Sequence, residues 1–246
     1  MPRTSNSTAR AVPRRALADH VFDELLSWLM DGTLTAGSSL NIDGIARELD
    51  VSPTPVREAL ARLEATGMVR RVALRGYFVT PAPTTKELMD LMDARLAVEP
   101  ANAYFACERG DEAFLTGLEE AVDELENSSN GPTYQEFRDY WEADERFHAL
   151  VAQAADNSYL QAAFAALGGL AQRFRQFSGK GVTDKAVAVE EHRAILDAMR
   201  SGVPERAQEL MRRHIEGVRA RSRSEREEPE APRKPPPPRG PKPPPP

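Results

Sequence analysis

The 246-residue chain has a single cysteine, Cys107, and no apolar run near the roughly 20 residues that a membrane-spanning helix needs. One cysteine excludes an internal disulfide framework and is typical of a reducing compartment. Cys107 follows Phe105 and Ala106, and we interpret it as a small buried hydrophobic residue. The first 15 residues carry arginines without an apolar segment behind them, which disfavours a signal peptide. We therefore expect a cytoplasmic protein with no membrane partner.

The chain also lacks an excess of basic charge, because its formal net charge is −6. The charge is unevenly distributed. Residues 1–83 hold 10 Lys/Arg and 9 Asp/Glu, residues 84–220 hold 15 and 25, and the remainder holds 7 and 4. Only the middle part is acidic, so the first part can approach a phosphate backbone without strong repulsion. This distribution permits DNA binding by the N-terminal part but does not establish it.

Length and composition indicate two folded domains in a chain with 41% hydrophobic and 28% charged residues. We expect a disordered arm over 1–13, a first domain over 14–82 and a second over 84–221. Prolines dominate the end of the chain, so we expect a disordered tail over 222–246.

The first domain reads as three helices and a β-hairpin. Apolar residues at helical spacing predict helices over about 15–30, 42–49 and 53–66, the last preceded by Ser52 as N-cap. Two short β-rich stretches, 68–72 and 75–79, predict the hairpin. This order predicts a winged helix-turn-helix.

The third helix would then enter the major groove of double-stranded DNA. Its apolar residues face the core, which leaves Thr54, Arg57, Ala61 and Arg62 facing the DNA. Ser52 and the free N–H groups of the helix start suit a phosphate, and Arg57 can pair bidentately with a base or phosphate. Arg75 and Gly76 would place the wing tip beside the backbone or minor groove. The alternative is a small packing domain with exposed arginines.

The second domain shows only helical periodicity. Six stretches, about 84–108, 111–127, 133–155, 157–177, 184–201 and 203–222, are separated by short connections. Short connections favour antiparallel neighbours in an all-helical bundle, so the fold class is mainly α.

Three of the four histidines lie in this bundle, each on an apolar helical face, whereas His20 lies in the first helix. His148, His192 and His214 come from three helices, and Asp144 lies one turn before His148. A buried histidine can be a hydrogen-bonded core residue. Four converging polar groups instead favour a divalent cation, Zn²⁺ or else Mn²⁺, Ni²⁺ or Fe²⁺, with open coordination positions.

Arg95 lies on the apolar face of the first bundle helix, with Leu88, Leu91 and Met92. A buried carboxylate effector would pair with it, and the alternative is a structural ion pair with Glu99 at i+4.

The segment Asp50–Leu60, DVSPTPVREAL, resembles the signature of the GntR family of bacterial regulators, and so does the loop Gly32–Leu40. The resemblance spans about residues 15–80 and implies DNA binding. Pro53 stands where family members often have an arginine, and Asp43 stands where some members have one, so no operator sequence is carried over.

Residues 84–220 resemble the FCD effector domain of the FadR-type branch of this family. The matching segments are Asp144–His148, Glu191–His192 and Met211–His214, with Arg95–Glu99 near the domain start. The resemblance implies that Asp144 and the three histidines are the metal ligands.

The sequence thus predicts a homodimeric, metabolite-responsive repressor of operator DNA that is not an enzyme. Binding of a small carboxylate would change the placement of the DNA-binding domains. A metal-dependent hydrolase is one alternative, although no general base apart from the ligands stands out. An architectural DNA-binding protein with structural histidines is the other.

Overall fold

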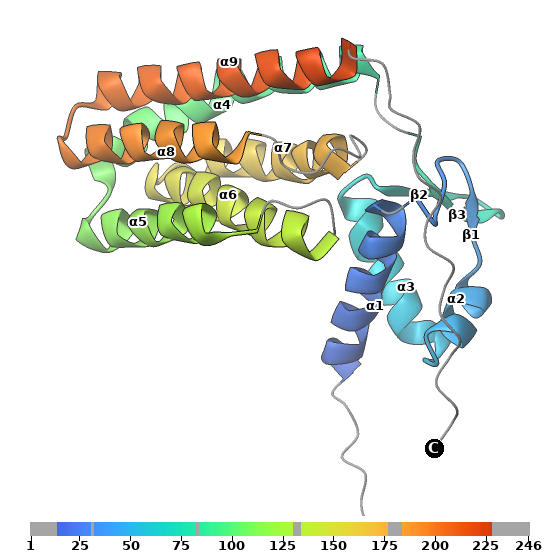
Figure 1. Cartoon of the computed structure of the whole chain (residues 1–246). Helices are drawn as coiled ribbons and strands as arrows, with labels where there is room; N and C mark the ends of the chain where they lie inside the picture. Colours follow the sequence, from blue (N-terminus) through green and yellow to red (C-terminus); the bar gives the residue numbers. More distant parts are fainter. Residues whose placement is uncertain (1–13, 31, 82–83, 130–133, 177–183, 228–246) are drawn as a thin grey trace, which may run out of the picture.

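The computed structural model describes residues 14–30, 32–81, 84–129, 134–176 and 184–227. The expected arm over 1–13 and the proline-rich stretch after residue 227 lie outside them. The described chain forms a small N-terminal unit below one end of a helical bundle (Figure 1).

The N-terminal unit is a winged helix-turn-helix, as predicted. It comprises α1 (Arg14–Met30), α2 (Ile42–Glu48), α3 (Pro53–Ala65) and an antiparallel sheet of order β1-β3-β2. The hairpin strands are β2 (Val69–Val72) and β3 (Gly76–Val79). The sequence did not predict β1 (Ser39–Leu40), which pairs with β3, because two residues are too short to show a period.

The residues at the start of α3 leave its first turn accessible at the protein surface. Ser52 has extended backbone angles (φ −72°, ψ 161°) and Pro53 occupies the first turn, but the Ser52 side chain makes no capping hydrogen bond. Ser52 is exposed, so its hydroxyl is available at the protein surface. The helix is fixed on its other side by buried apolar residues, Val56, Ala59, Leu60 and Leu63.

The bundle contains the six predicted helices. They are α4 (Thr85–Arg109), α5 (Glu112–Asn127), α6 (Tyr134–Ala154), α7 (Ser158–Gln176), α8 (Lys185–Arg200) and α9 (Pro204–Glu227). A capping box between Thr84 and Glu87 begins α4. The last helix continues to Glu227, beyond the predicted end near 222, because the charged stretch is compatible with a helix projecting past the core.

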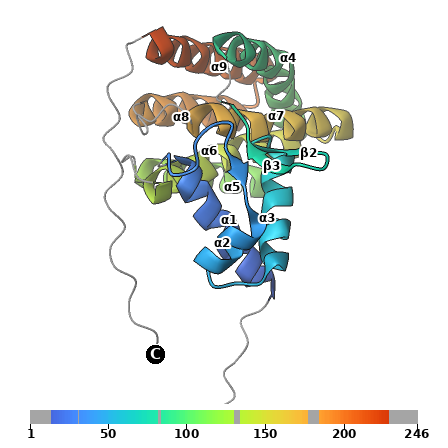
Figure 2. The same ribbon diagram turned by 90° about the vertical axis from the view of Figure 1, so that its right-hand side faces the viewer.

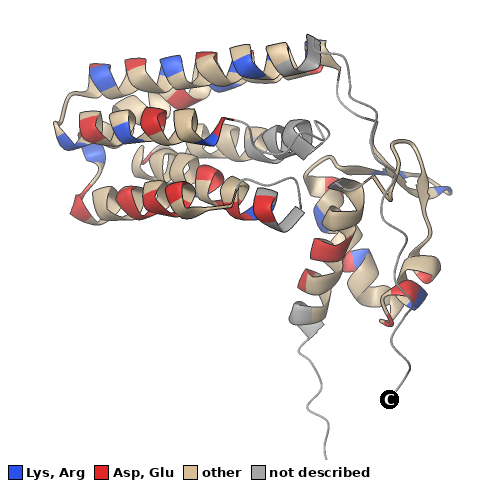
Figure 3. Ribbon diagram, viewed as in Figure 1, with Lys and Arg blue, Asp and Glu red and all other residues tan. Residues whose placement is uncertain are grey.

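The helices are layered around one apolar core. Helix α4 lies beside α9, with α7 and α8 in the middle and α5 and α6 on the far side (Figures 1 and 2). The core takes buried side chains from five of these helices, including Leu91, Leu118, Phe147, Ile195 and Met211. Acidic residues are frequent along α5 and α6 (Figure 3). Within the described parts, no helix is both long and apolar enough to cross a membrane.

The two units touch where α1 approaches the N-terminal half of α6. Arg138 of α6 lies there, with its Nη1 3.3 Å from Oδ2 of Asp23 on α1. Both side chains are partly exposed, and Arg138 also approaches Asp139 and Glu142 of its own helix. The helix that carries Asp144 and His148 is therefore in contact with the N-terminal unit.

Candidate metal centre and nucleic-acid interface

The structure brings the three predicted histidines together inside the bundle. His148 comes from α6, His192 from α8 and His214 from α9, and one ring nitrogen of each lies within 4.8 Å of the others. Their residue exposures are 3%, 0% and 1%, so the cluster is removed from bulk water. Each helix places its histidine inward because the residues at helical spacing around it are apolar.

The distances within the cluster fit one small cation. The Nε2 atoms of His192 and His214 are 3.4 Å apart, and Oδ1 of Asp144 is 3.7 Å from Nε2 of His192. Two nitrogens bound to one tetrahedral Zn²⁺ at about 2.0–2.1 Å lie about 3.4 Å apart. The structure brings the three predicted histidine ligands together. The fourth predicted ligand, Asp144, is buried beside His192 but lies outside this three-residue group, so its role as a ligand stays a prediction.

Nε2 of His148 provides an independent test of the fit. This atom is buried and has no hydrogen-bond partner among the described residues. A buried polar atom without a partner is energetically unfavourable, whereas a divalent cation would coordinate it. The donor set of three imidazoles and one carboxylate also matches the preferences of Zn²⁺ and similar ions.

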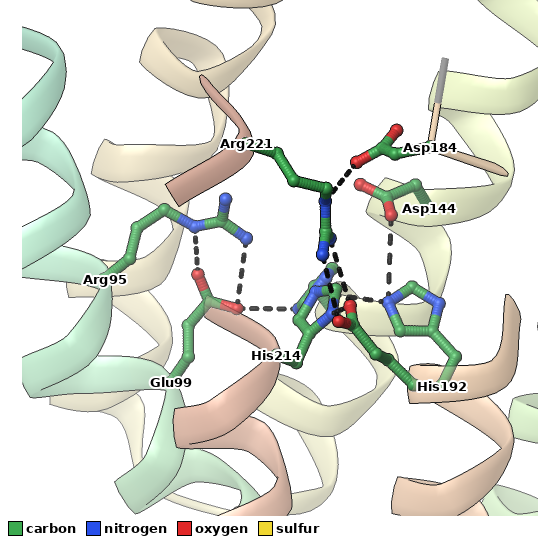
Figure 4. A network of polar contacts seen from close by, with 9 residues as sticks. Arg95, Glu99, Asp144, Asp184, His192, His214 and Arg221 are labelled. Carbon is green, nitrogen blue, oxygen red and sulfur yellow. Dashed lines mark hydrogen bonds and ion pairs between the residues drawn. The ribbon is translucent and has the colours of Figure 1, made fainter. Parts of the chain in front are cut away.

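Two carboxylates orient the rings from outside the cluster (Figure 4). Oε2 of Glu99 lies 2.6 Å from Nδ1 of His148, and Oε2 of Glu191 lies 2.7 Å from Nδ1 of His214. Because the Nδ1 atoms face these carboxylates, the Nε2 atoms are left for a ligand. Carboxylates in this position fix the tautomer and increase the basicity of a metal-binding imidazole.

Glu191 is itself held by an arginine near the end of α9. Two guanidinium nitrogens of Arg221 lie 3.0 and 3.1 Å from the two carboxylate oxygens, and its Nε donates to Asp184 at 2.9 Å. Sequence reasoning did not identify Glu191, Arg221 or Asp184 as part of the site. Contacts between helices depend on how each helix is rotated, and no local pattern reports that.

The surroundings shift the pKa values of His148 and His214 in opposite directions. Burial opposes ionisation of Glu99, but the Arg95 charge and His148 outweigh it and hold the pKa of Glu99 far below its usual range. Burial is also outweighed at His148, whose pKa is raised by Glu99. At His214 burial dominates, and the pKa is lowered. The lowered pKa keeps His214 in the neutral form that binds metals, whereas the raised pKa of His148 favours its protonated form when no metal is bound.

Arg95, the predicted effector contact, makes the ion pair with Glu99 that the sequence left as the alternative. Its Nε lies 2.5 Å from Oε1 and its Nη2 lies 3.4 Å from Oε2 of Glu99. The two side chains are 8% and 3% exposed. The pair links Arg95 to the histidine cluster through Glu99, so Arg95 lies at the edge of the candidate site.

On the DNA-binding unit, the structure exposes most of the predicted contacts. Ser52, Thr54 and Arg57 lie exposed at the first two turns of α3. Arg75 and Gly76 are exposed at the wing tip, where Gly76 has φ +89°, a conformation that favours glycine.

Arg62 differs, because its side chain lies against α1. Its Nη1 is 2.6 Å from Oδ1 of Asp19, and its guanidinium carbon lies 4.0 Å from the centre of the Phe22 ring. A phosphate contact by Arg62 would need this arrangement to open.

Three exposed arginines that the sequence did not single out widen the basic surface. Arg70 and Arg71 lie on β2 of the wing. Arg47 of α2 borders a surface hollow that Asp43 and Pro53 also line. Arg47 therefore places a positive charge beside Asp43 and Pro53, the two positions at which the sequence departs from the signature that it resembles.

Two ion pairs within α4, one buried and one exposed, give a direct test of how the buried charges are held. Glu99→Gln leaves Arg95 buried without its partner, so the free energy of unfolding of the metal-free protein should fall by about 3–5 kcal/mol. Asp90→Asn is the matched control, because Asp90 pairs with Lys86 at the same spacing on the exposed side of α4. That change should leave the stability nearly unaltered, as urea denaturation can measure. Equal effects of both substitutions would contradict the buried-pair assignment.

Comparison with known proteins agrees with both units. Residues 17–79 match the family model "Bacterial regulatory proteins, gntR family", and residues 90–217 match the FCD domain model. The chain is 29% identical over 220 residues to the uncharacterized HTH-type transcriptional regulator YcbG of Bacillus subtilis (strain 168), covering 85% of this chain and 91% of that protein. It is 28% identical over 216 residues to a Paenarthrobacter nicotinovorans protein named "Probable D-xylose utilization operon transcriptional repressor", covering 85% and 90%.

Among solved structures, E. coli McbR/YncC has the same fold, with a TM-score of 0.65 and 18% identity over 85% of this chain and 98% of that chain. Members of the matched families are regulators rather than enzymes, which removes the hydrolase alternative. The chain belongs to the GntR family of bacterial DNA-binding transcriptional regulators, and its C-terminal bundle is an FCD domain.

Proposed function

We propose that this regulator is a homodimeric repressor whose FCD domain holds one divalent metal ion and responds to a small carboxylate. The observation that carries the proposal is the buried cluster of His148, His192 and His214 with an unpartnered Nε2 on His148. The relative named as a D-xylose operon repressor supports the repressor reading by analogy. Such a protein acts where its operator lies, in the cytoplasm at the nucleoid.

Asp144 and the three histidines would hold the ion, with Zn²⁺ as the first choice and Mn²⁺, Ni²⁺ or Fe²⁺ as other candidates. The ion would supply positive charge and open coordination positions to an acidic ligand. Glu99 and Glu191 would hold the rings of His148 and His214 in the binding tautomer.

An anionic effector suits the charge of this site. Arg95 lies at its edge, and its guanidinium fork can bind a carboxylate bidentately. Glu99 occupies that fork in the structure, so a ligand carboxylate must share or replace the Glu99 contact. Binding would thereby act on the residue that also orients His148.

The contact between the units offers a route from the effector site to the DNA. Arg138 lies six residues before Asp144 on α6 and is paired with Asp23 of α1. One turn before Asp23, Asp19 of the same helix holds Arg62 of α3. A shift of α6 would thus move α1 and, through Asp19, the DNA-reading helix α3. Operator affinity would change if the ligand binds one arrangement of these helices more tightly than the other.

The metal prediction can be tested by elemental analysis of the dialysed full-length protein. The wild type should retain about one divalent ion per chain, and His148→Ala should weaken binding by more than about 100-fold, since losing even an outer-shell partner costs 10–100-fold. His20→Ala is the matched control, because His20 is an exposed residue of α1 outside the cluster. If the wild-type protein retained no metal, the metal proposal would be contradicted. The histidines would then be structural, as in the alternative of an architectural DNA-binding protein.

The DNA-reading prediction concerns Arg57. Arg57→Ala should weaken binding to the intergenic DNA beside the gene by about 1–3 kcal/mol if this side chain reads a base. Arg193→Ala, an exposed arginine of α8 that pairs with Asp123 and Glu126, should bind like the wild type. Fluorescence anisotropy at fixed salt measures both. Unchanged affinity of the Arg57 variant would remove it from the contacts.

The coupling route predicts a selective defect. Zinc-loaded Arg138→Ala should bind metal and DNA like the wild type, but carboxylates that weaken wild-type operator binding should do so several-fold less. Arg146→Ala serves as control, because Arg146 lies on the same helix yet pairs with Glu120 and Glu124 of α5. A panel of small carboxylates in the anisotropy assay supplies the comparison. A full ligand response in the Arg138 variant would rule out this route.

A further inference from the structure

A metal ion at the histidine cluster would not explain the burial of one nearby polar side chain. Asn102 of α4 is 1% exposed, and neither its Oδ1 nor its Nδ2 has a hydrogen-bond partner in the described chain. An amide that is buried with both ends unpaired destabilises the fold by several kcal/mol in transfer experiments, unless something else satisfies it. Such a group requires a partner that the described protein groups do not supply, either an ordered water or a ligand.

Helix geometry places Asn102 on the side of α4 that faces the site. It follows Arg95 by seven residues and Glu99 by three, so the three side chains share one face. Helix α6 runs in the same direction as α4, since Glu99 meets His148 and Arg109 donates to the carbonyl of Ala155 at 2.6 Å. Asn102 therefore lies about one turn beyond the histidine layer.

The other helices contribute apolar side chains to that next layer. Helix α8 runs parallel to α4, because His192 lies beside His148 at the level of Glu99, and the later residues Met199 and Cys107 also meet, with the Cys107 sulfur 3.8 Å from the Met199 carbonyl. Helix α9 runs antiparallel to α4. Its His214 lies at the same level as Glu99, but the later residue Arg219 pairs with the earlier residue Asp93. The residues one turn beyond the three histidines are accordingly Val151, Ile195 and Met211, all buried. A charged ligand group would be unfavourable here, but a neutral hydrogen-bonding group would suit the amide.

We propose that Asn102 recognises a hydroxyl group of the effector, which makes the effector a hydroxycarboxylate. The inference rests on the carboxylate site proposed above. A hydroxyl donates one hydrogen bond and accepts another, which matches the two ends of the amide. Three residues of α4 span about 4.5 Å along the helix axis between Glu99 and Asn102. This spacing favours a hydroxyl on the third or fourth carbon over one on the carbon beside the carboxylate.

The test compares four matched ligands by calorimetry on the zinc-loaded full-length protein. The ligands are butyrate and its 2-, 3- and 4-hydroxy derivatives. For the wild type, the 3- or 4-hydroxy acid should bind about fivefold more tightly than butyrate, as expected for a net gain of one hydrogen bond. Asn102→Leu, which replaces the amide by an apolar group of similar size, should abolish this preference without loss of zinc or of butyrate binding. Asn102→Ala is a second variant, for the case that Asn102→Leu disturbs packing, and it should also abolish the preference for the hydroxy acid.

Asn127→Leu is the control, because Asn127 is exposed at the end of α5 and should leave the preference intact. The proposal is overturned if no hydroxy acid binds more tightly than butyrate, or if the preference survives in both Asn102 variants. Binding of butyrate without a hydroxyl preference would refute the role of Asn102 and leave the carboxylate site standing. Absence of binding by all four acids, in a protein that retains zinc, would refute the proposed carboxylate site as well.

Discussion

Burial of His148, His192, His214 and Asp144 in an apolar bundle is the constraint on which the rest of the effector domain depends. Four polar groups without water must find partners, and two levels of contact supply them. Glu99 and Glu191 bind the outer nitrogens of two rings, and Arg95 and Arg221 in turn neutralise these carboxylates. These contacts leave the Nε2 atom of His148 without a hydrogen-bond partner among the described residues, facing the other two histidines. This is the chemical reason for proposing a cation there.

The proposed site is also connected to the DNA-binding unit through one helix. Helix α6 carries Asp144 and His148 toward the core and Arg138 toward α1. Helix α1 holds Arg62 of the DNA-reading helix through Asp19 and Phe22. Under the proposed function, an ion or ligand that repositioned α6 would act on a helix that contacts both units. Because Arg62 is shared between an intramolecular contact and the expected DNA surface, its release is one way in which operator affinity could respond.

Much of this could be predicted from the sequence, and the parts that could not have physical reasons. Helical spacing located the bundle helices and the inward faces of the histidines, because 3.6-residue periodicity reports burial directly. It could not show that Glu99 contacts His148, 49 residues away, since that depends on the rotation of two separate helices. The strand Ser39–Leu40 was missed because only its pairing with β3 defines it. The side chain of Arg62 was expected at the DNA, because local pattern does not include Asp19 on another helix.

In the proposed regulator, the three histidines bind one metal ion together. X-ray absorption at the zinc edge of the zinc-loaded full-length protein tests it most directly. The account predicts a shell of nitrogen and oxygen atoms at about 2.0–2.1 Å, with the scattering pattern of three imidazoles. A sulfur atom at about 2.3 Å, which would implicate Cys107, or a shell with fewer than two imidazoles would contradict it.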